Sequence, residues 1–318
     1  MLLLAVAFAL QLVLPLGLVF WLWRRRALSR LEWLLRVLVV GSYLGAIALV
    51  GLWTFLPRSL PYLYIALFAL AAVASWLRTP PTVPLLPQGL GWLGRIGQAA
   101  FAALFLSYVI GALHGRTPPP GAVDLAFPLK NGTYYVINGG SVLLVNFHAR
   151  SRRPEMTRFR GQGYAVDLVK LNASGVPSNG LLAGDPHSYA IFAQPVYAPC
   201  AGIVRETENG VPDMRPPRTD PSRLLGDYVG IECKGVMVLL SHLERGSVQV
   251  AEGSQVARGQ MVARVGNSGY SSEPHLQIHA QRLGAGRGAT LLDADPVPVT
   301  FHGRYLVRGD QLTVGAGR

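Results

Sequence analysis

Apolar residues are concentrated in the first third of the chain, in four long runs. The runs cover residues 2–23, 34–55, 60–77 and 96–113. Each run is close to the roughly 17–25 residues that a helix needs to cross a bilayer. Arg24, Arg25 and Arg26 follow the first run instead of preceding it, which favours a membrane anchor over a cleaved signal peptide. The pattern predicts about four transmembrane helices within residues 1–115.

Charge in this membrane half predicts its orientation. Glu32 is its only acidic residue, while five arginines lie in residues 24–36, and Arg78 and Arg95 flank the loop before the last run. Positive charge accumulates in cytoplasmic loops, so we expect a multi-pass protein of the cell membrane with everything after about residue 114 outside the cytoplasm. No acidic, lysine or histidine side chain lies in the middle of a run, which disfavours a transporter.

The rest of the chain has the pattern of a β protein. A proline-rich linker at 116–121 separates the two halves, and short β-branched and aromatic runs follow from residue 122. The runs that predict strands are 133–138, 141–145, 164–169, 202–204, 228–231 and 236–240. Strands this short predict an all-β domain, an antiparallel sheet or barrel, over 122–305, with a tail at 306–318. The proline-rich segment 213–223 predicts an exposed loop of the kind that borders a site.

Composition narrows the function classes only slightly. The chain has 318 residues, is 50% hydrophobic with a mean hydropathy of +0.32, and carries a formal net charge of +12. Much of this charge is the arginine cluster beside the first membrane run, and no basic helix or aromatic RNA-binding motif is present, so we expect no nucleic-acid partner. Cys200 and Cys233 are the only cysteines, and outside the cytoplasm they either form a disulfide or stay buried thiols.

Candidate chemistry lies at the ends of the predicted strands. His275 and residue 277 are two apart on a strand, so they share a face at a distance of about 6.6 Å. His279 shares that face about 13 Å from His275, too far for one metal ion unless a bulge intervenes. Asp167 is the only acid in an apolar strand, and His242 ends another. A zinc peptidase needs three protein ligands and basic groups that move protons.

The segment from about Tyr134 to Gln281 resembles the lysostaphin-type, LytM-like zinc metallopeptidases, which cut the peptides of peptidoglycan. The matching segments are Tyr164–Lys170, Pro195–Val204, Ser241–Leu243, Val250–Gln260 and Gly266–His275. The resemblance implies a LytM-type β core in which Asp167 is a zinc ligand. It also implies that His242 and His275 are the catalytic histidines beside the zinc-bound water.

Two ligand positions depart from the family pattern, because Gly163 and Gln277 stand where the resemblance implies histidines. The amide of Gln277 is a poor substitute for an imidazole on zinc. His148 is a second candidate, since Asn146-Phe147-His148 resembles an Asn-x-His sequence in one subgroup of the family. His279 is an alternative if the last strand bulges.

The sequence therefore favours a membrane-anchored peptidoglycan metalloendopeptidase-like protein that uses a zinc-activated water. The alternative is a degenerate homologue, without activity, that binds the cell wall or regulates a partner hydrolase. Zn²⁺ is the expected cofactor, and the expected partners are peptidoglycan peptide and the lipid bilayer. The peptidase hypothesis requires Asp167, His242 and His275 to converge.

Overall fold

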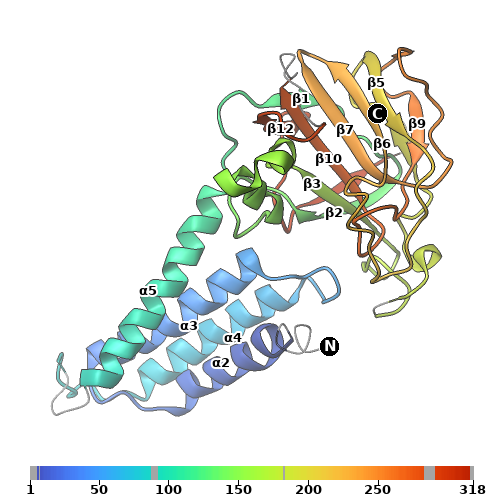
Figure 1. Cartoon of the computed structure of the whole chain (residues 1–318). Helices are drawn as coiled ribbons and strands as arrows, with labels where there is room; N and C mark the ends of the chain where they lie inside the picture. The colour runs from blue at the N-terminus through green and yellow to red at the C-terminus, as the bar shows by residue number, and fades with distance from the viewer. Residues whose placement is uncertain (1–5, 7, 87–91, 182, 283–290, 316–318) are drawn as a thin grey trace. The chain divides into compact units, whose positions relative to one another are not determined.

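The structure is a computed structural model, and it describes residues 6, 8–86, 92–181, 183–282 and 291–315. The chain divides into two compact units, Met1–Leu113 and His114–Arg318. Figure 1 shows helices in the first unit and a twisted sheet in the second.

The first unit is built from apolar helices. They are η1 (Ala9–Val13) running into α2 (Leu14–Arg24), α3 (Arg30–Val50), α4 (Leu60–Leu77) and α5 (Trp92–His114). Helices α3, α4 and α5 are long and apolar enough to cross a membrane, whereas Ala9–Arg24 is shorter. Three of the four predicted spans are thus confirmed by length and composition. Part of the first predicted run, residues 2–5 and 7, lies outside the described residues.

Local signals explain where helix α3 begins and ends. Ser29 is its N-cap, and its hydroxyl accepts a hydrogen bond from the Glu32 backbone N–H at 3.1 Å. The helix ends at Val50 because Gly51 adopts an extended conformation. The predicted second run, which extended to residue 55, was therefore too long at its C-terminal end.

The described residues of the second unit form one nine-stranded sheet and two smaller two-stranded sheets. The strands are β1 (Val123–Leu125), β2 (Gly132–Asn138), β3 (Val166–Leu171), β4 (Pro195–Tyr197), β5 (Gly202–Glu208), β6 (Asp227–Cys233), β7 (Val236–Leu243), β8 (Gln255–Val256), β9 (Met261–Arg264), β10 (Leu276–Arg282), β11 (Pro296–Val297), β12 (Val299–Phe301) and β13 (Gln311–Val314). The large sheet is antiparallel in the order β13-β2-β3-β10-β7-β6-β5-β8, with β11 on β10. This order does not close on itself, so the antiparallel sheet is confirmed and a barrel is not.

Strand β10 shows how the sheet separates its core from its site. Leu276, Ile278 and Ala280 face the main hydrophobic core, where Ile278 pairs with Val166 and Leu240. The alternate positions from 275 to 281 are all polar, and they too are buried. Because successive side chains on a strand point to opposite faces, one face of β10 supports the core and the other faces the candidate site.

Several predicted elements differ in the structure. Residues 141–145 form a turn and not a strand, and the short 3₁₀-helices η2 (Phe147–Arg152) and η3 (Pro154–Gln162) follow it. A third, η4, covers Pro186–Ser188. Strand β13 lies within the residues assigned to a tail, and it pairs with β2 at the edge of the large sheet. Pairing with β2 gives hydrogen-bond partners to the backbone groups of β13. The hydropathy of this segment alone does not reveal that pairing.

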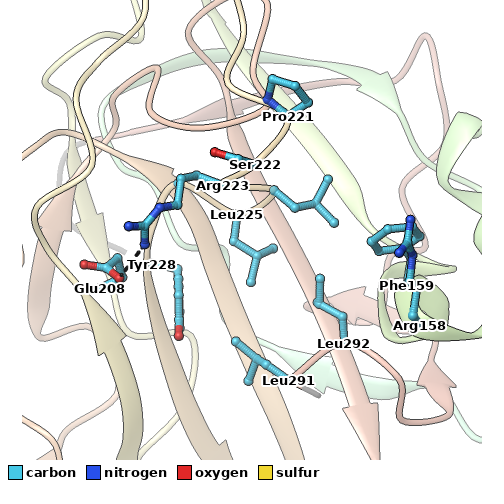
Figure 2. Close-up of a pocket in the computed structure, with 12 residues that line it drawn as sticks. Arg158, Phe159, Glu208, Pro221, Ser222, Arg223, Leu225, Tyr228, Leu291 and Leu292 are labelled. Carbon is cyan, nitrogen blue, oxygen red and sulfur yellow. Dashed lines mark ion pairs between the residues drawn. The ribbon is translucent and has the colours of Figure 1, made fainter. Parts of the chain in front are cut away.

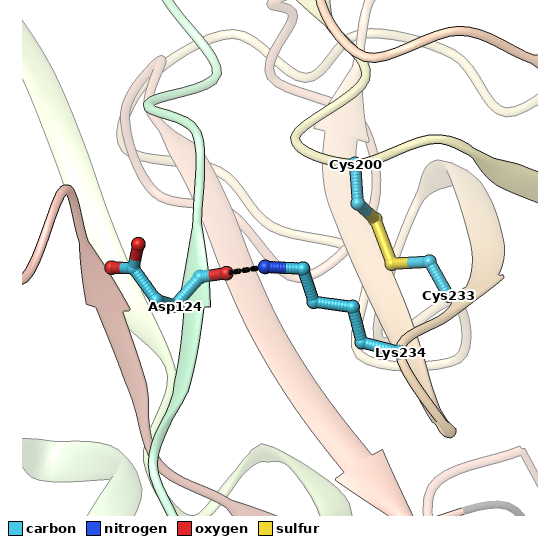
Figure 3. Close-up of a disulfide and its surroundings, with 4 residues drawn as sticks. All are labelled: Asp124, Cys200, Cys233 and Lys234. Atoms are coloured by element: carbon cyan, nitrogen blue, oxygen red, sulfur yellow. Dashed lines mark hydrogen bonds between the residues drawn. A yellow bond between two sulfur atoms is a disulfide. The ribbon is translucent and has the colours of Figure 1, made fainter.

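A disulfide joins Cys200, just before β5, to Cys233 at the end of β6, with 6.3 Å between the two α-carbons (Figure 3). Both side chains are buried in the main core. The bond closes a segment in which the two cysteines are 33 residues apart. A crosslink of this kind restricts the unfolded chain more than the folded one.

Replacing both cysteines by alanine should therefore lower the free energy of unfolding of this unit by about 3–4 kcal/mol, from the loop-closure entropy of a segment of this length. The measurement is urea-dependent hydrogen exchange of the β-strand amides in the detergent-solubilised chain. Reductant should shift the wild-type protein toward the variant and leave the variant unchanged. Equal urea midpoints for the two proteins would contradict the expectation.

Candidate active site

A row of aligned side chains crosses the sheet and defines the candidate site. Asp167 on β3 lies opposite Asn138 on β2 and Gln277 on β10, and Gln277 lies opposite Ser241 on β7. Ser241 in turn lies opposite Tyr228 on β6. Directly opposed residues of antiparallel strands project from the same face. The register alone thus brings five side chains from five strands onto one surface.

Asp167 is at the centre of the polar contacts. It is almost fully buried, and His148 Nε2 lies 3.0 Å from its Oδ1 and 2.9 Å from its Oδ2. Asn138 donates a second hydrogen bond to Oδ2 at 2.8 Å. Burial alone would raise the pKa of the Asp167 carboxyl, but the charge and hydrogen bond of His148 outweigh it and hold the pKa below its usual range.

His148 reaches Asp167 from the short helix η2 that follows the turn at 141–145. The side chain of Asn146 caps this helix by accepting a hydrogen bond from the His148 backbone N–H at 3.1 Å. The same side chain donates to the carbonyl oxygens of Gly140 and Ala165. Asn146 therefore ties the turn that carries His148 to the strand that carries Asp167.

The two predicted catalytic histidines lie beside this pair. His275 Nε2 is 3.9 Å from Asp167 Oδ1, and the rings of His242 and His275 are 4.8 Å apart. His275 Nδ1 lies 2.8 Å from the Glu273 carbonyl oxygen, and His242 Nδ1 lies 2.9 Å from the Ser268 carbonyl oxygen. A carbonyl only accepts, so each Nδ1 carries a proton, and Nε2 is the ring nitrogen that is left to face the site.

The environment of His242 keeps its ring neutral. Burial, and then the neighbouring His275, lower the pKa of His242 to about 3. Its backbone has a φ of 62°, in the left-handed region that residues with side chains seldom adopt. Such strain is typical of residues held in position for a function.

The two departures from the family pattern are structurally different. Position 163 has no room for a side chain, because a Cβ on Gly163 would lie 2.3 Å from Arg152 Cγ. Arg152 is fixed there by stacking on the Tyr164 ring and by a 2.8 Å hydrogen bond to its hydroxyl. Position 277 keeps its side chain in the row, where Gln277 Nε2 donates to Gln162 Oε1 at 3.2 Å.

His279 does not reach the position that a metal ligand would need. Strand β10 pairs with β7 in continuous register from Gln277 to Arg282, so the bulge that this alternative requires is absent from that stretch. His279 is fully buried, its Nδ1 lies 3.5 Å from Gln277 Nε2, and its Nε2 has no hydrogen-bond partner among the described residues. Burial lowers the pKa of His279 to about 3.

The residues present fit a zinc centre only in part. Within the ranges that the structure describes, no group of three or more His, Cys, Asp and Glu side chains is arranged to hold a metal ion. His148 Nε2 lies 2.9–3.0 Å from the two carboxylate oxygens of Asp167, and an imidazole and a carboxylate are both common zinc ligands. The third position offers the neutral amide of Gln277. The set therefore supplies two strong zinc ligands and does not complete the site.

A cavity of about 520 Å³ adjoins the row at the β6 end, where Tyr228 belongs to both. Figure 2 shows its leucines gathered between the Glu208–Arg223 ion pair, 3.6 Å long, and Phe159. The remaining lining residues are Arg158, Pro221, Ser222, Leu224, Leu225, Gly226, Leu291 and Leu292. The loop predicted at 213–223 lines this cavity through Pro221, Ser222 and Arg223. No sequence signal identified the cavity itself, because its walls come from four separate segments.

Similarity to known proteins agrees with this architecture. Residues 188–288 match peptidase family M23. The second unit therefore contains an M23 peptidase domain. This confirms the family resemblance predicted from the sequence, and the matched residues include His242, His275 and Gln277. No curated protein matches the chain.

Several solved structures are similar to the chain at low identity. A zinc-containing peptidase from Vibrio cholerae is 20% identical over 54% of this chain and 37% of its own length, with a TM-score of 0.30. Lysostaphin from Staphylococcus simulans is 19% identical over 43% of this chain and 42% of its own, with a TM-score of 0.26. A chain of the SpoIIQ–SpoIIIAH pore-forming complex is 18% identical over 55% of this chain and 93% of its own length, with a TM-score of 0.30.

The buried His279 predicts a pH dependence of stability. Its folded pKa lies below the unfolded value, so its contribution is present above about pH 6.5 and is lost as the pH falls toward 3. His279→Leu should remove this loss, at most about 1.4 kcal/mol per pH unit, and should keep the neutral-pH stability because it deletes the buried Nε2, which has no partner among the described residues.

The measurement is the free energy of unfolding of the second unit, His114–Arg318, which we call the M23 unit. It is determined at pH 7 and pH 5 by urea-dependent hydrogen exchange. His187→Leu, at an exposed histidine, is the matched control and should keep the wild-type difference. A His279→Leu protein as acid-sensitive as the wild type would refute the assignment.

Proposed function

We propose that the chain is a membrane-anchored M23 peptidase homologue whose second unit, outside the cell membrane, binds the peptide of peptidoglycan with little hydrolysis. One observation carries this proposal: beside His148 and Asp167, position 277 supplies only a neutral amide that is tied to Gln162, where zinc would need a third strong ligand. Zinc in this family would act as a Lewis acid and activate water, and two strong ligands do not hold it firmly. The row of polar groups remains able to bind a peptide.

The site offers complementary groups to an extended peptide. The neutral ring of His242 presents an Nε2 acceptor, which suits a peptide N–H group. The adjoining cavity has apolar walls that suit an aliphatic side chain. At its rim, Arg158 lies over the Phe159 ring at 4.5 Å and has no acidic partner within ion-pair distance among the described residues. A free guanidinium suits a ligand carboxylate, which stem peptides of the cell wall carry.

A second candidate is the zinc endopeptidase itself. It is favoured by the convergence of Asp167, His148, His242 and His275, with both catalytic rings held in one tautomer. His148, Asp167 and the Gln277 amide oxygen would then be the ligands. In that case His242 and His275 would be the proton-transfer groups.

Restoring one ligand distinguishes the two candidates. Gln277→His should raise zinc affinity at least about 100-fold and bring bound zinc to about one per chain, because it adds a third strong ligand beside His148 and Asp167. The wild-type protein should bind well below one zinc ion per chain. The measurement is metal analysis of the purified full chain, with competition against a chromophoric chelator.

Gly163→His is the matched control. It adds the same imidazole at position 163, the other position that differs from the family pattern. Because Arg152 fills the space there, the zinc content should not rise. His148→Ala in the Gln277→His protein should remove the gain. Stoichiometric, tightly bound zinc in the wild type, with chelator-sensitive cleavage of peptidoglycan, would overturn the binding proposal in favour of the peptidase.

The cavity rim predicts a charge effect on binding. Arg158→Glu should weaken binding of soluble peptidoglycan fragments about tenfold, the effect of losing one charge-assisted hydrogen bond. Fluorescence anisotropy of labelled fragments on the full chain measures it. Arg245→Glu, an exposed arginine outside the cavity, makes the same charge change and should bind as the wild type does. Equal losses in both variants would show that only net charge matters.

A further inference from the structure

Three basic residues, each followed by a glycine, meet at a second cavity in the M23 unit. The pairs are Lys234-Gly235, Arg258-Gly259 and His302-Gly303, and all three glycines have positive φ. Their basic side chains line one cavity of about 270 Å³. From these residues we propose that this cavity binds a phosphate group.

The cavity is separate from the candidate active site. Lys234 lies in the turn that joins β6 to β7, whereas His242 lies near the other end of β7. A strand rises about 3.3 Å per residue, so the eight residues of β7 place the two sites about 20 Å or more apart. Binding at this cavity is therefore distinct from the peptide binding proposed above.

The backbone conformations of the turns do not explain why positions 234 and 302 carry basic side chains. Lys234 and Gly235 join the paired residues Cys233 and Val236, and both have positive φ, as in a type I′ hairpin turn. Such a turn favours Asn, Asp or Gly at its first position, so a lysine there costs conformational energy. His302, with a φ of 50°, occupies the same position in a second turn. Residues held at such angles commonly serve a site.

Neighbouring groups position the lysine, and no carboxylate among the described residues lies within ion-pair distance of it. Its Nζ donates to the main-chain oxygen of Asp124, and Cys233 in the disulfide directly precedes it (Figure 3). The Asp124 carboxylate points away from the lysine in Figure 3 and accepts from the Thr300 hydroxyl at 2.8 Å and the Gly303 N–H at 2.7 Å. Across the described ranges, Lys234, Arg258 and His302 form no ion pair.

The donor set defines the chemistry of the ligand. An arginine fork and a lysine ammonium together are groups that proteins use for oxyanions such as phosphate, and a neutral sugar or an amide does not require them. Asp124, the acid in the lining, keeps its negative charge, because its hydrogen bonds from Gly303 and Thr300 and the nearby Lys234 and His302 lower its pKa. Lys234 and Arg258 therefore outweigh one carboxylate in the lining. A phosphate group can come from free phosphate, from a phosphodiester of a wall polymer or from a phospholipid headgroup, and all three present the same oxygens.

The test uses the full chain in a non-ionic detergent and phosphate-free buffer. Inorganic phosphate should bind saturably by isothermal titration, and Arg258→Gln should weaken binding at least tenfold. Lys234→Asn should weaken it to the same extent while the thermal midpoint stays the same or rises, because asparagine suits the turn. Arg245→Gln should bind as the wild type does.

Two further ligands identify the source of the phosphate. Glycerophosphoglycerol represents a wall phosphodiester, and nanodiscs with and without phosphatidic acid represent a headgroup. Tighter binding of either one than of inorganic phosphate, lost in Lys234→Asn, supports the site and names its ligand. Absence of saturable phosphate binding, or unchanged binding in both Lys234→Asn and Arg258→Gln, overturns the proposal without affecting the peptide-binding or zinc measurements.

Discussion

The burial of one carboxylate, that of Asp167, is the constraint around which the site is organised. A carboxylate in the interior of a sheet is costly unless charged and hydrogen-bonding partners surround it. His148 and Asn138 supply these partners, and His275 faces the same carboxylate. The helix η2, its Asn146 cap and the order of the central strands all serve to keep those groups in place.

The same constraint separates metal binding from peptide binding. A zinc ion needs a third strong ligand, while a peptide needs acceptors, donors and a shaped cavity. The structure retains the second set in His242, His275 and the leucine-lined cavity. Arg152 fills the space beside position 163, and the amide of Gln277 occupies position 277. Only position 277 has room for an imidazole.

The M23 unit also carries two distinct regions on one sheet. Strands β6 and β7 join them, with His242 near one end of β7 and Lys234 beyond the other. The disulfide anchors the end that carries the lysine. A sheet with a continuous core between its two ends can hold each set of side chains rigidly, since the backbone of every central strand is paired on both sides.

Periodicity and residue type determined much of this chain: the apolar helices, the β unit, and the polar face of β10 that alternates with Leu276 and Ile278. These features depend on neighbours along one segment, so the sequence reveals them. The contact of His148 with Asp167, across 19 residues, and the occupation of position 163 by Arg152 were decided only by tertiary structure. So was the meeting of three basic turns at one cavity. Each depends on the path of loops between strands, where no periodic pattern fixes how a side chain is aimed.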